Sequence, residues 1–317
     1  MTCYCCNGEA AKFGFFHNRN RTVQRYRCRR CGKTFAEKQP LDGVRIELAK
    51  SVQVVHLMAE GMGIRAISRL TQLNKRTVLG ILEVAGQRCA ELLDAHIQNV
   101  KAENVQVDEI HTFVGCKRKR NTFEDLERGD FFTYLSVDRE SKLIINWRTS
   151  KRNRENTLAF MQDLKTRIPE RFQLTTDAFI PYWRGKGVVG QVFGQNIDYA
   201  TELKIFGRSN NQISRFFNPL TVIGIKRQRR IGTSDLTTST TCHAERTNLS
   251  VRTFTRRFTR CTLGYSKKVA NLQYAVAIFI AHFNFCRVHS AHKQTPAMAA
   301  GLADHAWSVE EMLTRPV

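Results

Sequence analysis

The stretch 104–115 limits the possible folds of this chain more than any other, because a strand pattern there carries two adjacent acids. Its β-branched and aromatic residues predict a β-strand, which Asp108 and Glu109 interrupt. An edge strand that turns its polar side chains to water would explain a single acid. Acids elsewhere in the chain favour a different explanation, a functional site.

A second expected strand, 171–177, also ends on an acid, Asp177. It follows a stretch, 154–168, whose apolar residues recur at helical spacing. In open sheets built from strands and helices, functional groups gather just past the carboxyl ends of the strands. Acids far apart in the sequence can therefore converge, and Glu245 is the third acid expected at this site.

The charge balance indicates a polyanionic partner. The chain has 50 Lys and Arg against 28 Asp and Glu, a formal net charge of +22, and a pI near 10.0. Nucleic acid is the partner that such an excess favours. With 317 residues, 42% of them hydrophobic, the chain is long enough for about two or three domains with a full core.

Neither a membrane segment nor a disulfide framework is expected. The longest apolar run, 275–281, is far shorter than the ~20 residues of a spanning helix, and the N-terminus lacks an apolar signal region. We therefore expect a cytoplasmic protein. Ten cysteines are present, and those outside two N-terminal pairs are expected to be reduced thiols: Cys5, Cys89, Cys116, Cys242, Cys261 and Cys286.

Two Cys-x-x-Cys pairs near the N-terminus predict a structural zinc site: Cys3 with Cys6, and Cys28 with Cys31. Each pair can turn two thiolates onto one Zn²⁺ and so complete a closed tetrahedral site with four cysteine ligands. Cys5 could replace Cys6, but the first pair would then be Cys-x-Cys, a poorer match to the usual spacing. His17 is a weaker rival ligand.

Residues 1–40 are therefore predicted to form a zinc ribbon. Its basic side chains include Arg25, Arg27, Arg29 and Arg30. The segment has too few apolar residues to fold alone, so the metal is expected to stabilise it. A small basic ribbon of this type most often binds phosphates, and a solvated surface on a scaffold module is the alternative.

Residues 41–98 show the pattern of a helix-turn-helix DNA-binding domain. Expected helices cover 46–60 and 64–70, and a third begins after a short turn. The third helix opens with residue types that reach phosphates and base edges: Lys75, Arg76 and Thr77. A plain helical hairpin is the alternative.

Two more strands, 131–137 and 143–148, are expected before the helix and the strand that ends on Asp177, with a hairpin turn between them. The order β-β-β-α-β resembles the opening of a ribonuclease H-like fold, an α/β fold with a mixed sheet. Further on, a helix through Tyr182 and a strand near 197–199 are expected, and 207–241 is interpreted as an irregular insertion.

A helix is predicted to begin near Cys242 or His243. On a helical wheel Glu245 shares its side with Arg252 and Arg256. Arg257 and Arg260 follow. A solvated surface helix would explain the pattern, but phosphates that pass the acid explain the arginines better.

Four segments together resemble transposases of the insertion-sequence-one family: 243–249 with its Glu-Arg-x-Asn block, 256–260, 266–268 and 295–301. The order of cysteine ribbon, helix-turn-helix and acid-bearing strand also matches that family, so the resemblance covers nearly the whole chain. It implies a ribonuclease H-like catalytic domain over 99–301, in which the first and fourth strands are neighbours, and a tail over 302–317.

The resemblance implies that Asp108, Asp177 and Glu245 form an Asp-Asp-Glu triad that holds Mg²⁺ or Mn²⁺. It also implies DNA cleavage and strand transfer at the terminal inverted repeats of a mobile element in a prokaryotic cell. The expected partners are double-stranded DNA, as element ends and target, and further copies of the chain in a synaptic complex. A DNA-binding regulator with an inactive catalytic domain, and a nuclease that does not join ends, are the alternatives.

The chain departs from the family pattern in two ways. Both halves lie in one continuous chain, whereas the family often splits its reading frame between them. The second and third acids are also 245 − 177 = 68 positions apart, longer than in the shorter members. Glu202 and Asp235 therefore remain rivals of Glu245 for the third ligand.

Overall fold

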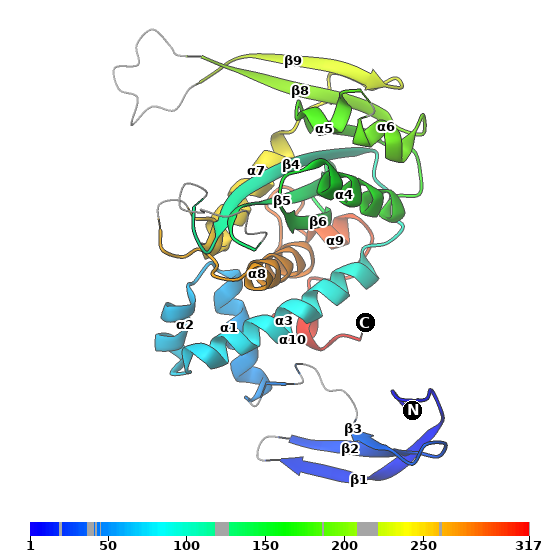
Figure 1. The fold of residues 1–317 in the computed structure, drawn as a ribbon, viewed down its shortest axis with the longest axis vertical. Helices are drawn as coiled ribbons and strands as arrows, with labels where there is room; N and C mark the ends of the chain where they lie inside the picture. Colours follow the sequence, from blue (N-terminus) through cyan, green and yellow to red (C-terminus); the bar gives the residue numbers. More distant parts are fainter. Residues whose placement is uncertain are drawn as a thin grey trace.

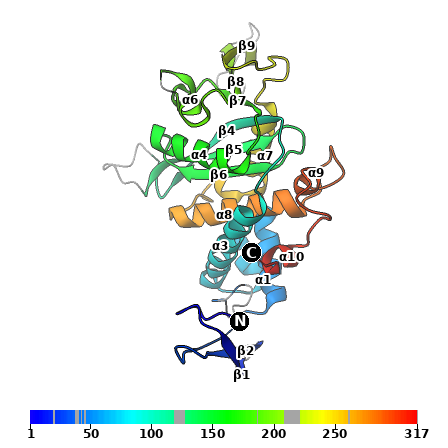
Figure 2. The same ribbon diagram turned by 90° about the vertical axis from the view of Figure 1, so that its right-hand side faces the viewer.

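The computed structural model describes the chain apart from residues 19–20, 37–40, 42, 45, 118–126, 186, 208–220, 260–261 and 317, and apart from the side chains of Asn18 and Arg21. Along its longest axis the molecule has three parts (Figure 1): an N-terminal β-ribbon at one end, a layer of helices, and a mixed α/β part with a large sheet. The C-terminus lies against the helical layer (Figures 1 and 2).

The N-terminal ribbon is a three-stranded antiparallel sheet: β1 (Ala10–Asn18), β2 (Arg21–Cys28) and β3 (Thr34–Ala36). Among its described hydrophobic residues, only Cys3, Ala10, Val23 and Cys28 are buried. A core this small cannot offset the conformational entropy of about 35 residues, so the ribbon needs a further source of stability.

The helical layer contains three helices within the range expected for the helix-turn-helix domain: α1 (Leu48–Ala59), α2 (Ile64–Thr71) and α3 (Lys75–His96). The Asn74 side chain caps α3 by accepting a 2.9 Å hydrogen bond from the Arg76 backbone N–H. Gly86 of α3 lies against Tyr274 of α8 (Val269–Ala281), and a Cβ atom at Gly86 would stand 2.3 Å from that of Tyr274. The absent side chain thus permits unusually close packing of α3 on α8.

The large sheet has six strands in the order β6-β5-β4-β7-β8-β9. The strands are β4 (Asn104–Val114), β5 (Gly129–Asp138), β6 (Ile144–Ser150), β7 (Gln173–Asp177), β8 (Asp198–Gly207) and β9 (Thr221–Ile231). Strand β7 is parallel to β4 and to β8, and the other pairs are antiparallel. The first and fourth strands of this sheet, β4 and β7, are therefore neighbours, as expected.

Helices cover both faces of this sheet. The helices α4 (Arg154–Arg167), α5 (Ile180–Trp183) and α6 (Val188–Phe193) connect β6 to β7 and β7 to β8. On the opposite face, α7 (Cys242–Phe254) packs against β4 and β5. Because side chains alternate along a strand, β4 turns Gln106 and Asp108 towards α7 and Glu109 towards α5.

The region 207–241 differs from the expected irregular insertion. Residues 208–220 lie outside the described part, but Thr221–Ile231 form β9, which pairs with β8 from Gly207 back to Tyr199. Gly224 and the basic residues on β9 hid the pattern of a strand. Together β8 and β9 form a ribbon that projects past the helices (Figure 1).

The apolar C-terminal stretch is part of the core of the molecule. Helix α8 continues into a π-helical turn, His282–Cys286, and is followed by two short helices, α9 (Pro296–Ala299) and α10 (Val309–Thr314). Val269–Cys286 has a mean hydropathy of 1.4 and, by length and composition alone, could span a membrane. This segment was not identified from the sequence, because only uninterrupted runs of apolar residues were considered. In this structure 61% of it is buried, and the core helix of a globular protein meets the same requirement.

Candidate functional site

Two of the predicted acids meet because their strands are parallel neighbours. The paired positions of β4 and β7 end at Val107 and Thr176. Asp108 and Asp177 are the next residues on the two strands. Their carboxylate oxygens, together with one from Glu109, lie within 4.8 Å of one another. This group is called the acidic cluster below.

Asp108 is held in place by two hydrogen bonds. Its Oδ2 accepts one of 2.8 Å from Nδ2 of Asn248 on α7, and its Oδ1 accepts one of 2.8 Å from the Glu109 backbone N–H. Burial is the largest cause that raises the pKa of Asp108 to about 6; the nearby charges of Asp177 and Glu245 act in the same direction, and the two hydrogen bonds oppose them. The hydrogen bonds therefore fix the carboxylate but only partly offset the cost of its ionised form.

Glu109 has the lowest exposure in the acidic cluster, 2% of its side chain, and both of its oxygens accept hydrogen bonds. One comes from the Tyr182 hydroxyl of α5, and the other, of 2.9 Å, from the guanidinium of Arg152. The same Arg152 nitrogen lies 3.4 Å from Asp177 Oδ2. Burial, with Asp177 as the second cause, raises the pKa of Glu109 to about 8. Arg152 is thus a cation built into the cluster.

The structure places Glu245 beside this cluster. Among the described carboxylates, it is not part of the group that converges within 4.8 Å. Its charge nevertheless raises the pKa of both Asp108 and Asp177, although burial is the larger cause for each. Glu245 Oε1 accepts a 2.8 Å hydrogen bond from the Thr241 hydroxyl and an ion-paired one from the Lys204 ammonium. The Glu245 side chain is 43% exposed, so it is accessible to a ligand.

The two rival acids are engaged elsewhere. Glu202, the strand partner of Asp177, is buried and binds the Arg227 guanidinium at 2.9 Å and the Thr241 hydroxyl at 3.1 Å. Asp235 is exposed and accepts hydrogen bonds from the backbone and hydroxyl of Thr237, which form a local turn. Both carboxylates therefore have structural partners, and neither belongs to the acidic cluster among the described residues.

The donor set of the acidic cluster fits a divalent cation. Carboxylate oxygens are the ligands that Mg²⁺ and Mn²⁺ prefer. Burial raises the pKa of all three acids, because each ionised group is poorly solvated near like charges. Asn248 Oδ1, beside Asp108, is buried and makes no hydrogen bond with a described residue. A bound cation would relieve the repulsion.

The arginines near Glu245 are arranged differently from the helical-wheel prediction. Helix α7 ends at Phe254 and a 3-10 turn, Arg256–Phe258, follows, because Thr255 adopts an extended conformation. Arg252 therefore shares the helix with Glu245, but Arg256 does not. The Arg257 guanidinium points inward and donates a 3.0 Å hydrogen bond to the Asn271 carbonyl, and burial lowers its pKa to about 10. Arg260 lies outside the described residues.

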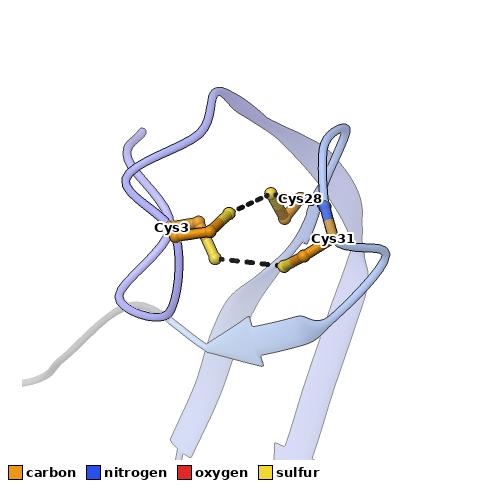
Figure 3. Close-up of side chains that lie close together, drawn as sticks. Cys3, Cys28 and Cys31 are labelled. Carbon is orange, nitrogen blue, oxygen red and sulfur yellow. Dashed lines mark hydrogen bonds between the residues drawn. The ribbon is translucent and has the colours of Figure 1, made fainter.

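The four predicted cysteines come together at the N-terminus. The Sγ atoms of Cys3 and Cys31 are 3.7 Å apart, and Figure 3 shows both side chains with Cys28. The Sγ atoms of Cys6 and Cys28 are 3.5 Å apart, and all four sulfurs lie within 4.8 Å of one another. A tetrahedral site with metal–sulfur bonds of about 2.3 Å separates its sulfurs by about 3.8 Å, so the four thiols fit such a metal.

Backbone N–H groups prepare the cysteine site. Those of Cys31 and Arg30 donate to Cys28 Sγ at 3.4 and 3.3 Å, and they lower the pKa of Cys28 to about 6 against the effect of burial. At Cys28 the thiolate form, which binds metals, is thereby favoured, whereas burial and the neighbouring thiols raise the pKa of Cys31. Cys5 is outside this group and accepts a 3.0 Å hydrogen bond from Lys33, and His17 pairs with Thr22.

The predicted DNA-binding residues occupy two surfaces. Lys75 and Arg76 are exposed at the start of α3, and Thr77 is half-buried there. On the ribbon, Arg27, Arg29 and Arg30 are exposed, whereas Arg25 is half-buried.

The guanidinium groups of Arg25 and Arg27 lie 5.8 and 5.5 Å from the centroid of the exposed Phe13 ring. The Arg29 guanidinium lies 3.9 Å from the Glu9 carboxylate. The ribbon thus presents guanidinium groups beside an aromatic ring.

Sequence reasoning gave no role to four residues around the acids: Glu109, Arg152, Tyr182 and Lys204. Alternation along a strand could have indicated that Glu109 faces away from Asp108. Arg152 lies two residues after the end of β6, at the same end of the sheet as the acids, which is a weaker signal. Nothing local marks Lys204, because its pairing with Glu245 spans 41 positions.

Comparisons with known proteins are distant. No protein-family model matches the chain, and no curated protein matches it. The chain is similar to a chain of the piggyBac transposase synaptic complex with hairpin DNA, with a TM-score of 0.36 and 10% identity over 84% of this chain and 68% of the other. It is also similar to a chain of a pre-cleavage Mos1 transpososome, with a TM-score of 0.21 and 11% identity over 53% of this chain and 62% of the other. Neither likeness is close enough to assign a fold or a function to this chain.

Proposed function

We propose that this chain is a DNA transposase of the insertion-sequence type with a ribonuclease H-like catalytic domain. It cuts and joins DNA with divalent cations held by Asp108, Asp177 and Glu245. The observation that carries the proposal is the meeting of Asp108 and Asp177 just past the paired ends of parallel neighbouring strands. This is the position where open sheets of this type place their functional groups, and the net charge of +22 suits DNA.

The protein side chains would prepare the cation site. A bound divalent cation supplies charge stabilisation for the attacking and leaving oxygens of a phosphodiester. Asn248 fixes the orientation of Asp108 through its 2.8 Å hydrogen bond. Arg152 and Lys204 neutralise part of the carboxylate charge. Glu245 is in the first turn of α7, where a 43% exposed side chain can turn towards the cluster.

DNA would be bound by parts of the chain distant from the acids. The helix-turn-helix presents Lys75 and Arg76 at the exposed start of α3, where a recognition helix contacts base edges and phosphates. The ribbon, with Zn²⁺ in its cysteine site, presents further arginines for the phosphate backbone. The proposal includes element ends and target DNA as substrates, more than one copy of the chain in the synaptic complex, and a location at the nucleoid.

The test uses the full chain, duplexes that carry the element's own ends, and Mg²⁺. Asp108→Asn and Asp177→Asn should lose cleavage and strand transfer down to background and keep their affinity for the duplexes. Retained activity in both variants would overturn the enzyme proposal and favour a DNA-binding regulator. Products that are cut but never joined would indicate a nuclease.

A matched pair identifies the third ligand. Glu245→Gln should be as inactive as the aspartate variants, whereas Glu109→Gln should keep part of the activity, because Glu109 is already occupied by Tyr182 and Arg152. The opposite ranking would assign the third carboxylate to Glu109. Single-turnover cleavage rates over a range of Mg²⁺ concentrations measure the difference.

A further inference from the structure

Another group of metal-type ligands lies away from the sheet, between α1 and α8. His56 and Glu60 are four residues apart at the end of α1, so their side chains share one face of the helix. His282 begins the π-helical turn that follows α8. One nitrogen of each histidine and one Glu60 oxygen lie within 4.8 Å of one another. Helix α1 packs against α8, as Figures 1 and 2 show.

The three side chains are well suited to coordinate an ion. No described residue forms a hydrogen bond with either imidazole ring, although His282 is only 7% exposed. Burial lowers the pKa of His282 to about 4, so its ring is neutral and offers a lone pair at neutral pH. His56 and Glu60 are exposed, which gives an ion access from solvent. π-helical turns are rare and often mark functional sites.

One neighbouring charge opposes a cation. The Arg287 guanidinium lies 3.9 Å from Glu60 Oε1 and is stacked over the Phe254 ring, 3.5 Å from its centroid. The 3.9 Å separation is longer than a hydrogen bond, so the ion pair is weak. The two imidazole rings lie 6.3 Å apart between centroids and are tilted by 43°. Simple ring packing would explain that contact, but it leaves the His282 ring without a hydrogen bond to a described residue.

We propose that His56, Glu60 and His282 bind one divalent transition-metal ion, with zinc as the ion that two imidazoles and one carboxylate favour. Three protein ligands leave a fourth position for water on the exposed side. The ion joins the end of α1, in the helix-turn-helix, to α8, in the core of the catalytic part. It therefore adds a further link between the DNA-binding helices and that core, beside the packing of α3 on α8. This inference does not depend on the proposed transposase activity.

The first experiment counts zinc in the full-length protein. Dialysed wild-type protein should hold about two zinc ions per chain, one in the cysteine site and one here. His56→Asn and Glu60→Gln should each hold about one. Both changed side chains are exposed, so the variants should fold.

Two variants are controls. His305→Asn changes another exposed histidine beside two acids, Asp304 and Glu311, and should keep both ions. Asp108→Asn, included to exclude zinc at the acidic cluster, should also keep both.

Cobalt separates the two sites spectroscopically. With the cysteine site filled by zinc, one further equivalent of Co²⁺ should give visible d–d absorption without thiolate-to-metal charge transfer. His56→Asn and His282→Asn should lose this absorption, and Arg287→Gln should strengthen Co²⁺ binding because a competing cation is removed. A wild-type protein that holds a single zinc overturns the proposal. So does a second ion that persists in both His56→Asn and Glu60→Gln.

Discussion

The cysteine site and the acidic cluster could both hold a metal ion, yet their surroundings are opposite. The ribbon around the cysteines has almost no buried apolar side chains, and its four sulfurs are close together near the surface. The acidic cluster lies in a six-stranded sheet with helices on both faces. Two cations lie in or beside it: Arg152 binds Glu109 and Asp177, and Lys204 binds the neighbouring Glu245.

This difference separates two uses of a metal. In the ribbon a metal would take the place of a hydrophobic core, so metal binding and folding would be a single event. The sheet does not need an ion in order to fold, and repulsion between the ionised acids destabilises the folded state. Loss of a ligand should therefore destabilise the first region and stabilise the second, provided that no divalent cation is bound there.

The largest expected effect is at the ribbon. Cys28→Ser should release zinc and unfold residues 1–36, because Cys28 is one of four converging sulfurs and also anchors backbone N–H groups. Amide protection of the ribbon by hydrogen exchange and zinc content by elemental analysis measure this. Cys5→Ser is the matched control and should change neither. A ribbon whose amides stay protected without zinc would show that the ribbon, like the sheet, folds without a metal.

The opposite sign is expected for Asp108→Asn in magnesium-free buffer. Folding raises the pKa of Asp108 from 3.8 to about 6, so its ionised form at pH 7 costs up to about 3 kcal/mol. Asn removes the charge, and its amide oxygen can still accept the hydrogen bond from Asn248. Urea unfolding of the zinc-loaded protein should show this gain. Added Mg²⁺ should then stabilise only the wild type. Destabilisation of the variant would show that repulsion between the acids does not destabilise the wild-type protein.

The pH dependence should separate the two buried acids. The folded state keeps the proton of Glu109 up to about pH 8, whereas the unfolded chain releases it near 4.5. The unfolded state then binds fewer protons, so stability falls as pH rises between these values, by about 1.4 kcal/mol per pH unit. Relative to Glu109→Gln, the metal-free wild type should lose stability between pH 6 and 8. Parallel curves for the two proteins would show that Glu109 ionises normally.

The smallest expected effect concerns Lys204. This ammonium pairs with Glu245 and so competes with a cation for that carboxylate. The pair is partly exposed, which limits its strength to about 0.5–1 kcal/mol. Lys204→Met should therefore tighten Mg²⁺ binding by about two- to fivefold. Isothermal titration calorimetry measures the change. Lys226→Met, on the neighbouring strand β9, is the control, and weaker Mg²⁺ binding in Lys204→Met would mean that Lys204 supports the site.

Short-range patterns made much of the fold predictable. Helical spacing predicted α2 and α3 to within a residue at most of their ends, and β-branched residues predicted β4 and β7. The strand order then placed Asp108 and Asp177 together. Features that depend on tertiary contacts were not predictable. Strand β9 is stabilised by its pairing with β8, and α7 ends at Phe254 although its helical pattern continues.

The site shows the same division. Spacing alone selected Cys3, Cys6, Cys28 and Cys31, because two short knuckles specify a metal site locally. The cations of the acidic cluster could not be found this way. Arg152 lies 43 positions from Glu109, and Lys204 lies 41 positions from Glu245. No local pattern distinguishes these two from the other 48 Lys and Arg among the 50 in the chain.

The close contact between Gly86 and Tyr274 holds α3 in a fixed position relative to α8. The 22 residues of α3 form a rod of about 33 Å, which packs on α8 beneath the sheet. Should the exposed start of α3 bind DNA, the distance from the bound sequence to the acids would be constant. The position of a cut relative to the recognised sequence would then be determined by helix packing, without any base contact near the scissile bond.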